Sequence, residues 1–303
     1  MGATAIRTDR LTMSYRHGRG IVDVDLDVAV GEVFGFLGPN GAGKTTTIRV
    51  LLDFLRPTSG RATVFGLDSH ADSLEIRRRT GYLSGDFTLP SNLTGSEVLD
   101  WLSSLRPETP PVRRAELVER FAVQLDRPMK QLSKGNRQKI GLVQAFQHAP
   151  ELVILDEPTS GLDPLIQDEF HRLVREFVDD GGTVFLSSHS LDEVQHTADR
   201  VGIIRDGQMV TIETVDELRH RGVRRVTLTV RSGTGESVVE ALRAVPGIDH
   251  LSRRGDVFEF AVTGEYAPVL RRLGELPVVD VLSRAADLDE VFLALYRGSE
   301  GEC

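Results

Sequence analysis

The pattern Gly-x-x-x-x-Gly-Lys-Thr, filled by Gly38, Gly43, Lys44 and Thr45, constrains this chain more than any other feature of its sequence. Residues 33–37 before it form a short apolar run typical of a strand, and residues 46–55 after it carry apolar side chains at helical spacing. Glycine lets backbone N–H groups turn toward a phosphate, and the N-terminus of the next helix adds partial positive charge. The sequence therefore predicts a strand, a phosphate-binding loop and a helix, with a nucleoside triphosphate as ligand.

Two side chains of this loop have expected roles. Lys44 is expected to reach the β- and γ-phosphates, and the Thr45 hydroxyl to ligate Mg²⁺. The residues expected to surround the phosphates are Gly38, Pro39, Asn40, Gly41, Ala42, Gly43, Lys44, Thr45 and Thr46. An ordinary Gly-rich turn is the alternative, but the strand–loop–helix context favours the phosphate loop.

Composition excludes several classes of protein. The 303 residues suggest one large domain with a small one, or two comparable domains. No apolar run approaches the ~18 residues of a membrane span, and the N-terminus lacks the apolar core of a secretory signal. The only cysteine is Cys303, which fits a reducing compartment, and we expect a cytoplasmic protein. The net charge of −9 argues against a nucleic-acid partner.

Strand and helix patterns divide the chain into two expected domains. Residues 1–222 alternate between apolar strands and helices, which indicates an α/β domain with a parallel sheet covered on both faces. Residues 86–130 interrupt this pattern with several prolines and helical periodicity, so we expect a helical insertion there. A polar, basic linker at 215–225 leads to residues 223–303, for which we predict a small α+β domain.

An acidic pair follows one of the predicted buried strands. Residues 152–155 are apolar, and Asp156 and Glu157 come directly after them. A carboxylate at the C-terminal end of such a strand can hold Mg²⁺, directly or through water, beside the phosphate loop. The next carboxylate can polarise the attacking water. We therefore expect Asp156 at the metal and Glu157 at the water.

Two further stretches accompany the phosphate loop and the acidic pair. Residues 132–136 read Leu-Ser-Lys-Gly-Asn, and Ser188-His189 follow the next predicted strand. In this order, the set resembles the ATP-binding subunit of ATP-binding-cassette (ABC) transporters over residues 4 to about 220, with the signature Leu-Ser-Gly-Gly-Gln changed to Leu-Ser-Lys-Gly-Asn. The resemblance implies a P-loop ABC ATPase fold that binds ATP and Mg²⁺.

The resemblance also implies specific roles for the matching residues. Glu157 would be the general base and His189 the switch histidine on the γ-phosphate. Ser133 and Gly135 would act in trans on the γ-phosphate held by the partner's Lys44. The aspartate loop would be Ser160-Gly161-Leu162-Asp163, which adds Asp163 to the nucleotide-binding residues. Two copies would thus enclose two ATP molecules in a homodimer.

Tyr15 has two interpretations. An aromatic ring about twenty residues before the phosphate loop can stack on adenine or pack half-buried on a strand. The residue pattern alone does not separate these alternatives. The resemblance favours adenine stacking.

The sequence departs from the family pattern at two positions. Gly85 stands where the family usually has glutamine, so Asp86 or water would supply the missing oxygen to Mg²⁺. Lys134 stands where the usual signature has glycine, and its side chain would point to the partner's γ-phosphate or to solvent.

The remaining segments suggest a transport role. The helical insertion resembles the subdomain through which these ATPases bind their membrane partner, and residues 288–293 resemble the end of drug-exporter ATPases of the daunorubicin-resistance type. The expected function is to power export of a drug or another small hydrophobic or lipid cargo. The expected partners are transmembrane permease subunits on separate chains, at the cytoplasmic face of the cell membrane.

Two other functions remain alternatives. A soluble ABC-type ATPase acting on ribosomes or DNA usually carries two cassettes and basic linkers, whereas this chain has one phosphate loop and one signature. A regulatory ATP-binding module is disfavoured because Glu157 and His189 are both present, although Gly85 keeps it open.

Overall fold

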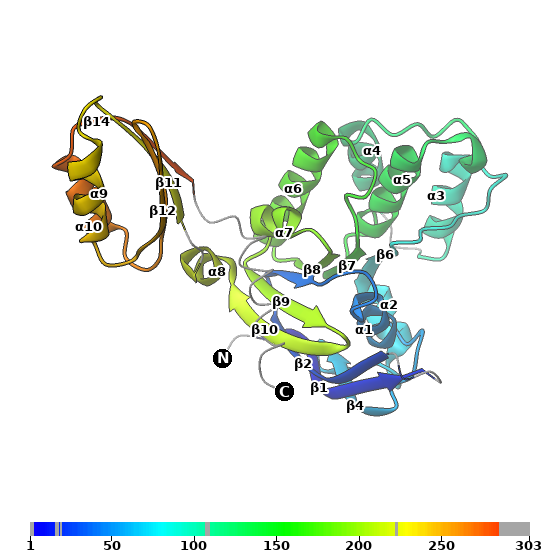
Figure 1. Cartoon of the computed structure of the whole chain (residues 1–303). Helices are drawn as coiled ribbons and strands as arrows, with labels where there is room; N and C mark the ends of the chain where they lie inside the picture. Colours follow the sequence, from blue (N-terminus) through cyan, green and yellow to red (C-terminus); the bar gives the residue numbers. More distant parts are fainter. Residues whose placement is uncertain (1–2, 16–17, 19, 107–109, 222–223, 285–303) are drawn as a thin grey trace. The chain divides into compact units, whose positions relative to one another are not determined.

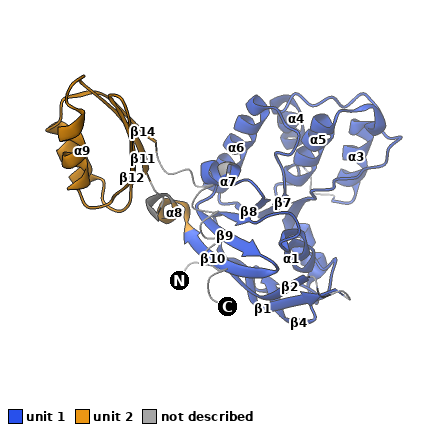
Figure 2. Ribbon diagram, viewed as in Figure 1, with its two compact units in different colours: residues 1–213 blue, residues 214–303 orange. Residues whose placement is uncertain are grey.

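The computed structural model describes residues 3–15, 18, 20–106, 110–221 and 224–284. The chain divides into two compact units, Met1–Glu213 and Thr214–Cys303 (Figure 2). The division falls before the boundary expected at residue 222, because part of the expected linker is helix α8 (Val215–Arg221). Thr214 begins this helix with reciprocal hydrogen bonds to Glu217, which form a capping box.

A six-stranded sheet forms the centre of the first unit (Figure 1). Its strands lie in the order β10-β9-β3-β8-β7-β6. Neighbours from β9 to β6 pair in parallel, and every residue of β3, β7 and β8 is buried. This agrees with the parallel sheet expected from continuous apolar runs. The bounds are β3 Val33–Leu37, β6 Thr80–Leu83, β7 Leu152–Asp156, β8 Thr183–Ser188, β9 Arg200–Arg205 and β10 Gln208–Thr214.

A second sheet of four strands, in the order β2-β1-β4-β5, pairs antiparallel throughout. Its strands are β1 Thr4–Ser14, β2 Gly20–Ala29, β4 Ser59–Val64 and β5 Leu67–Asp68. Helix α1 (Lys44–Leu51) shares an apolar core with both sheets through Ile48 and Leu51. The helix is shorter than the predicted 46–55, because the chain turns at Asp53 with a φ of 57°.

The other helices that the structure describes in the first unit lie against the central sheet or in the helical insertion. They are α2 Ser73–Arg79, α3 Gly95–Ser104, α4 Pro111–Arg120, α5 Lys134–Phe146, α6 Pro164–Asp179 and α7 Leu191–Thr197, with a 3₁₀ turn at Met129–Gln131. The expected insertion at 86–130 contains α3, α4 and the start of this turn, and α5 packs on both helices. Arg120 of α4 forms ion pairs with Glu169 and Glu176 of α6. In the described part of the chain, no helix is long and apolar enough to cross a lipid bilayer.

The second unit has a β-α-β-β-α-β order after helix α8. Its elements are β11 Arg224–Val230, α9 Gly235–Arg243, β12 Ile248–Arg254, β13 Val257–Val262, α10 Ala267–Gly274 and β14 Val278–Arg284. The strands form an antiparallel sheet in the order β12-β13-β11-β14. Its core joins strand residues such as Leu228 and Phe258 to Val238 and Leu273 of the helices. Residues 288–293, which resemble the end of the drug-exporter ATPases, lie outside the described residues.

Candidate active site

The phosphate loop connects β3 to α1 and lines a cavity of about 410 Å³. Its glycines are required by the backbone. Gly43, the N-cap of α1, has a φ of 112°, and Gly41 has a φ of 84°. A Cβ atom at Gly38 would lie 2.4 Å from the carbonyl oxygen of Ile204. The expected loop is therefore a tight, glycine-dependent strand-to-helix connection.

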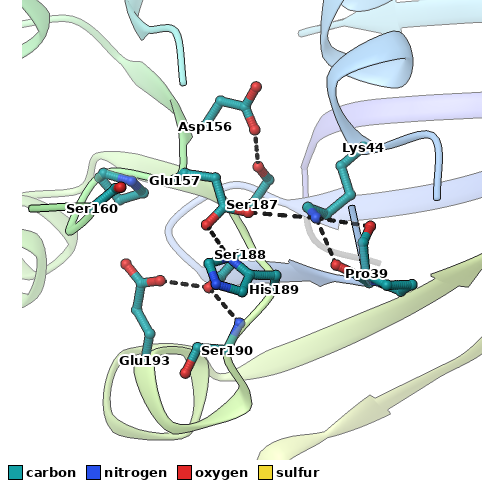
Figure 3. Close-up of polar contacts among 12 residues, drawn as sticks. Pro39, Lys44, Asp156, Glu157, Ser160, Ser187, Ser188, His189, Ser190 and Glu193 are labelled. Carbon is teal, nitrogen blue, oxygen red and sulfur yellow. Dashed lines mark hydrogen bonds and ion pairs between the residues drawn. The ribbon is translucent and has the colours of Figure 1, made fainter. Parts of the chain in front are cut away.

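The Lys44 ammonium is buried at the base of this cavity, with 6% of the side chain exposed. It donates hydrogen bonds to the carbonyl oxygens of Gly38 (2.6 Å) and Pro39 (3.3 Å). Its Nζ also lies 3.4 Å from Glu157 Oε1 (Figure 3). The charge is thus held where the loop would receive a phosphate.

Thr45 and Asp156 bring hard oxygen donors together. Thr45 Oγ1 donates to Asp156 Oδ2 over 2.7 Å, and Ser187 Oγ donates to the other carboxylate oxygen. The strand order explains this contact, because β8 lies between β3 and β7 and pairs Asp156 with Ser187. A hydroxyl and a carboxylate are ligands that Mg²⁺ accepts, so these two residues fit the expected metal.

Glu157 lies between two nitrogen groups of the site. Its Oε2 is 2.6 Å from His189 Nδ1, and its Oε1 is the oxygen facing Lys44. Glu157 has a φ of 52°, in the left-handed region that non-glycine residues rarely adopt. This strained conformation directs the carboxylate into the cavity at the end of β7.

Other loops close the rim of the cavity. Ser84, Gly85 and Asp86 line it, which brings the segment after β6 next to Asp156. A Cβ atom at Gly85 would lie 3.5 Å from the Asp156 carboxylate, an ordinary van der Waals distance. The position that lacks glutamine therefore lies beside the expected metal ligand, and a Cβ atom would fit there without a clash. Asp86 is exposed at the rim.

Tyr15 lies beside the first turn of α1. Its hydroxyl is 3.5 Å from Thr46 Oγ1, and 38% of the residue is exposed. The ring is therefore accessible near the loop. Adenine stacking by Tyr15 stays a prediction.

Three residues of the signature and the aspartate loop, Ser133, Gly135 and Asp163, do not line their own chain's cavity, whereas Ser160 of the aspartate loop does. Ser133 caps α5 by accepting a hydrogen bond from the Asn136 N–H, and Asp163 caps α6 by accepting one from the Ile166 N–H. A Cβ atom at Gly135 would lie 2.7 Å from the Gly161 carbonyl oxygen, so the two segments pack closely. Of the signature, only Lys134 lines the cavity.

Sequence reasoning missed several residues around the site. Arg49 of α1 lines the cavity. Gln138 of α5 donates to the carbonyl oxygens of Glu157 (3.2 Å) and Pro158 (2.9 Å), which supports the strained segment. Glu193 of α7 is buried beside Ser188. No motif marks these residues, and only their place in the fold reveals them.

Comparison with known proteins identifies the family. A model of the ABC transporter family matches residues 21–160. The chain is 35% identical to a daunorubicin/doxorubicin resistance ATP-binding protein of Streptomyces peucetius, over 96% of this chain and 92% of that protein. The chain belongs to the ABC transporter family. This ABC protein is also 36% identical to a bacitracin transport ATP-binding protein of Bacillus licheniformis, over 72% of each chain.

Solved structures of ABC ATP-binding subunits have the same fold. An ATP-binding subunit of an ABC transporter superposes with a TM-score of 0.64 at 28% identity, covering 71% of this chain and 92% of that one. The predicted P-loop ABC ATPase fold is confirmed. This ABC protein binds nucleotide and is an ATPase of the exporter type.

Proposed function

We propose that this ABC ATPase powers export of a drug-like or other small hydrophobic or lipid cargo through transmembrane subunits on separate chains, at the cytoplasmic face of the membrane. One observation carries the proposal: the match to a daunorubicin/doxorubicin resistance ATP-binding protein extends over 96% of this chain, beyond the ATPase unit. The bacitracin transport relative supports the same class of work.

The site suggests how hydrolysis proceeds. Lys44 would bind the β- and γ-phosphates, and Thr45 and Asp156 would hold Mg²⁺, which neutralises phosphate charge when bound. Glu157 would accept the proton of the attacking water. His189, 2.6 Å from Glu157, would orient the γ-phosphate and the base toward one another. Tyr15 would stack on the adenine, and Asp86 or water would supply the oxygen that the missing glutamine does not.

We further propose that the complete site needs two copies of the chain. Ser133, Gly135 and Asp163 lie outside the cavity that contains their own chain's Lys44, which supports a role across a homodimer interface. ATP would then act as part of the interface. Dimerisation would depend on ATP, and hydrolysis would let the two copies separate.

The helical insertion supplies a surface for the membrane partner. Trp101 and Leu105 at the end of α3 and Val112 at the start of α4 are 50%, 65% and 68% exposed. Exposed large apolar side chains on these two helices of the insertion support a protein contact. We assign them to the transmembrane subunits.

Reconstitution tests this function. The subunit is co-expressed with candidate transmembrane chains, purified from detergent-solubilised membranes and placed in vesicles with daunorubicin. We expect co-purification and ATP-dependent movement of the drug, both lost in a Trp101→Ala/Leu105→Ala variant that keeps basal ATPase activity. Recovery of the subunit with ribosomes or DNA, and not with membrane proteins, would contradict export.

Mixed dimers test the shared site. Ser133→Arg should abolish hydrolysis without weakening ATP binding to the monomer, and Lys44→Ala should weaken that binding. Mixing the two variants should restore at most one working site per dimer. Equal loss of monomer ATP binding in both variants would assign Ser133 to its own chain's pocket.

A further inference from the structure

A buried glutamate lies behind the loop that carries His189. Glu193 of α7 is 8% exposed, and its Oε2 accepts a hydrogen bond of 2.5 Å from Ser188 Oγ (Figure 3). The same Ser188 hydroxyl accepts a hydrogen bond of 3.0 Å from the Ser190 N–H. Glu193 is therefore linked to the residues on both sides of His189.

His189 depends on its backbone for its position. Its side chain is 57% exposed, so packing restrains the ring little. Its Nδ1 nevertheless lies 2.6 Å from Glu157 Oε2. The conformation of residues 188–190 must then set where the ring lies, and the Ser188 hydroxyl is the group that joins the two ends of this short loop.

A role in packing alone does not explain why a glutamate occupies position 193. Its Oε1 is buried without a hydrogen-bond partner among the described residues, which is costly for a carboxyl group. Burial raises the pKa of Glu193, while the hydroxyls of Ser188 and Thr159 oppose that rise and the charge of Glu157 adds to it. An apolar residue would fill this position at lower cost, so the carboxyl group calls for another reason.

We propose that Glu193 is a positioning residue for ATP hydrolysis: through Ser188 it fixes the loop that holds His189 against Glu157. This inference rests on the proposed roles of Glu157 and His189. Glu193 itself touches no reacting atom. Its loss should therefore slow the chemical step and leave nucleotide binding unchanged, because Lys44 and the phosphate loop lie on other elements.

Single variants measure the effect. Glu193→Ala and Ser188→Ala should each lower kcat roughly 10- to 100-fold, the scale for misplacing a catalytic group by about an ångström. Nucleotide affinity should stay within about twofold of wild type, because a residue that acts only on the chemical step lowers kcat without weakening ground-state binding. Glu193→Gln should lower kcat less than Glu193→Ala does, because its amide oxygen can accept the hydrogen bond from Ser188. The matched control is Glu213→Ala, which removes another buried glutamate with a hydroxyl donor, Thr211, on edge strand β10; it should keep the wild-type kcat.

Combination with His189→Ala decides the mechanism. If Glu193 acts through His189, the double variant should be no slower than His189→Ala alone. If the fold-losses in kcat of the two single variants multiply in the double variant, the inference is overturned. A wild-type kcat in both Glu193→Ala and Ser188→Ala would also overturn it. A His189→Ala variant with wild-type turnover would instead contradict the proposed function. Ser188→Ala leaves α7 intact, so the inference remains testable if Glu193→Ala does not fold.

Discussion

Lys134 Nζ donates a hydrogen bond of 2.8 Å to Ser160 Oγ, which joins the signature segment to the loop after Glu157. The stem of the same lysine packs over Gly161, where an added Cβ atom would lie 3.2 Å from Lys134 Cδ. The side chain is exposed, in agreement with the solvent alternative, and it also contacts its own chain, which the sequence did not indicate. We interpret the contact as a link that keeps the two segments expected to act in trans in a fixed relation.

A double-mutant cycle tests this link. Lys134→Met keeps the stem and removes the charge and the hydrogen bond, whereas Ser160→Ala removes the acceptor. We expect each variant to weaken ATP-dependent dimerisation, with a coupling of about 0.5–1 kcal/mol, because the hydrogen bond is exposed. Additive effects in analytical ultracentrifugation across the cycle would show that the two residues act independently.

Glu157→Gln tests the general base. We expect ATP binding to be kept and hydrolysis to slow by roughly 10²–10⁴, because the amide cannot accept the proton of the attacking water. The variant should accumulate as a nucleotide-bound dimer in size-exclusion chromatography. Glu151→Gln, just before the start of the same strand, serves as control and should turn over normally. Near-normal turnover in Glu157→Gln would rule out this assignment.

The position that lacks glutamine gives a third prediction. We expect Gly85→Gln to raise the basal ATPase rate of the isolated subunit, since a Cβ atom there makes only ordinary contact with Asp156 and the amide oxygen would lie near the expected Mg²⁺ site. We also expect low basal activity in wild type and marked stimulation by the membrane subunits.

The competing explanation is that Asp86 already supplies this oxygen. In that case Asp86→Ala should lower activity while Gly85→Gln changes little. Both variants are measured with and without the membrane subunits. If neither changes the rate in either setting, the loop after β6 is not part of the hydrolytic site.

His148 should make stability depend on pH. Burial, aided by the charge of Arg106, lowers the pKa of His148 from 6.5 to about 4. Between these values the unfolded chain binds a proton that the folded protein does not, so the free energy of unfolding falls as the pH drops from 6.5 toward 4. The contribution is up to roughly 3 kcal/mol. In urea titrations at pH 7.5, 5.5 and 4.5, His148→Gln should lose less stability than wild type, and parallel losses would contradict this explanation.

The parts of the site that sequence reasoning predicted are those that occupy strand ends. The phosphate loop, Asp156 and the Ser188-His189 pair follow three buried apolar runs, and these runs became the adjacent parallel strands β3, β7 and β8. Their meeting at one sheet edge follows from parallel pairing. Chemistry-bearing motifs were therefore located by pattern alone.

Other features depend on neighbours that no local pattern reveals. Strand β12 was missed because Asp249, Ser252 and Arg254 give it a polar, exposed sequence, and it is a strand because it pairs with β13. Glu193 is one acidic residue of a short helix, and only the fold brings it to Ser188. The Lys134–Ser160 contact joins two segments whose separate motifs were recognised but whose packing was not.

The ion pair between Lys44 and Glu157 has a consequence for product release. A buried ammonium that loses a phosphate would be stranded without a counterion, which is energetically severe. Here the carboxylate 3.4 Å away can replace the departing anion. With Lys44 in its proposed role, the ammonium would exchange the departing phosphate for this carboxylate in each cycle, so release would not leave a buried charge uncompensated.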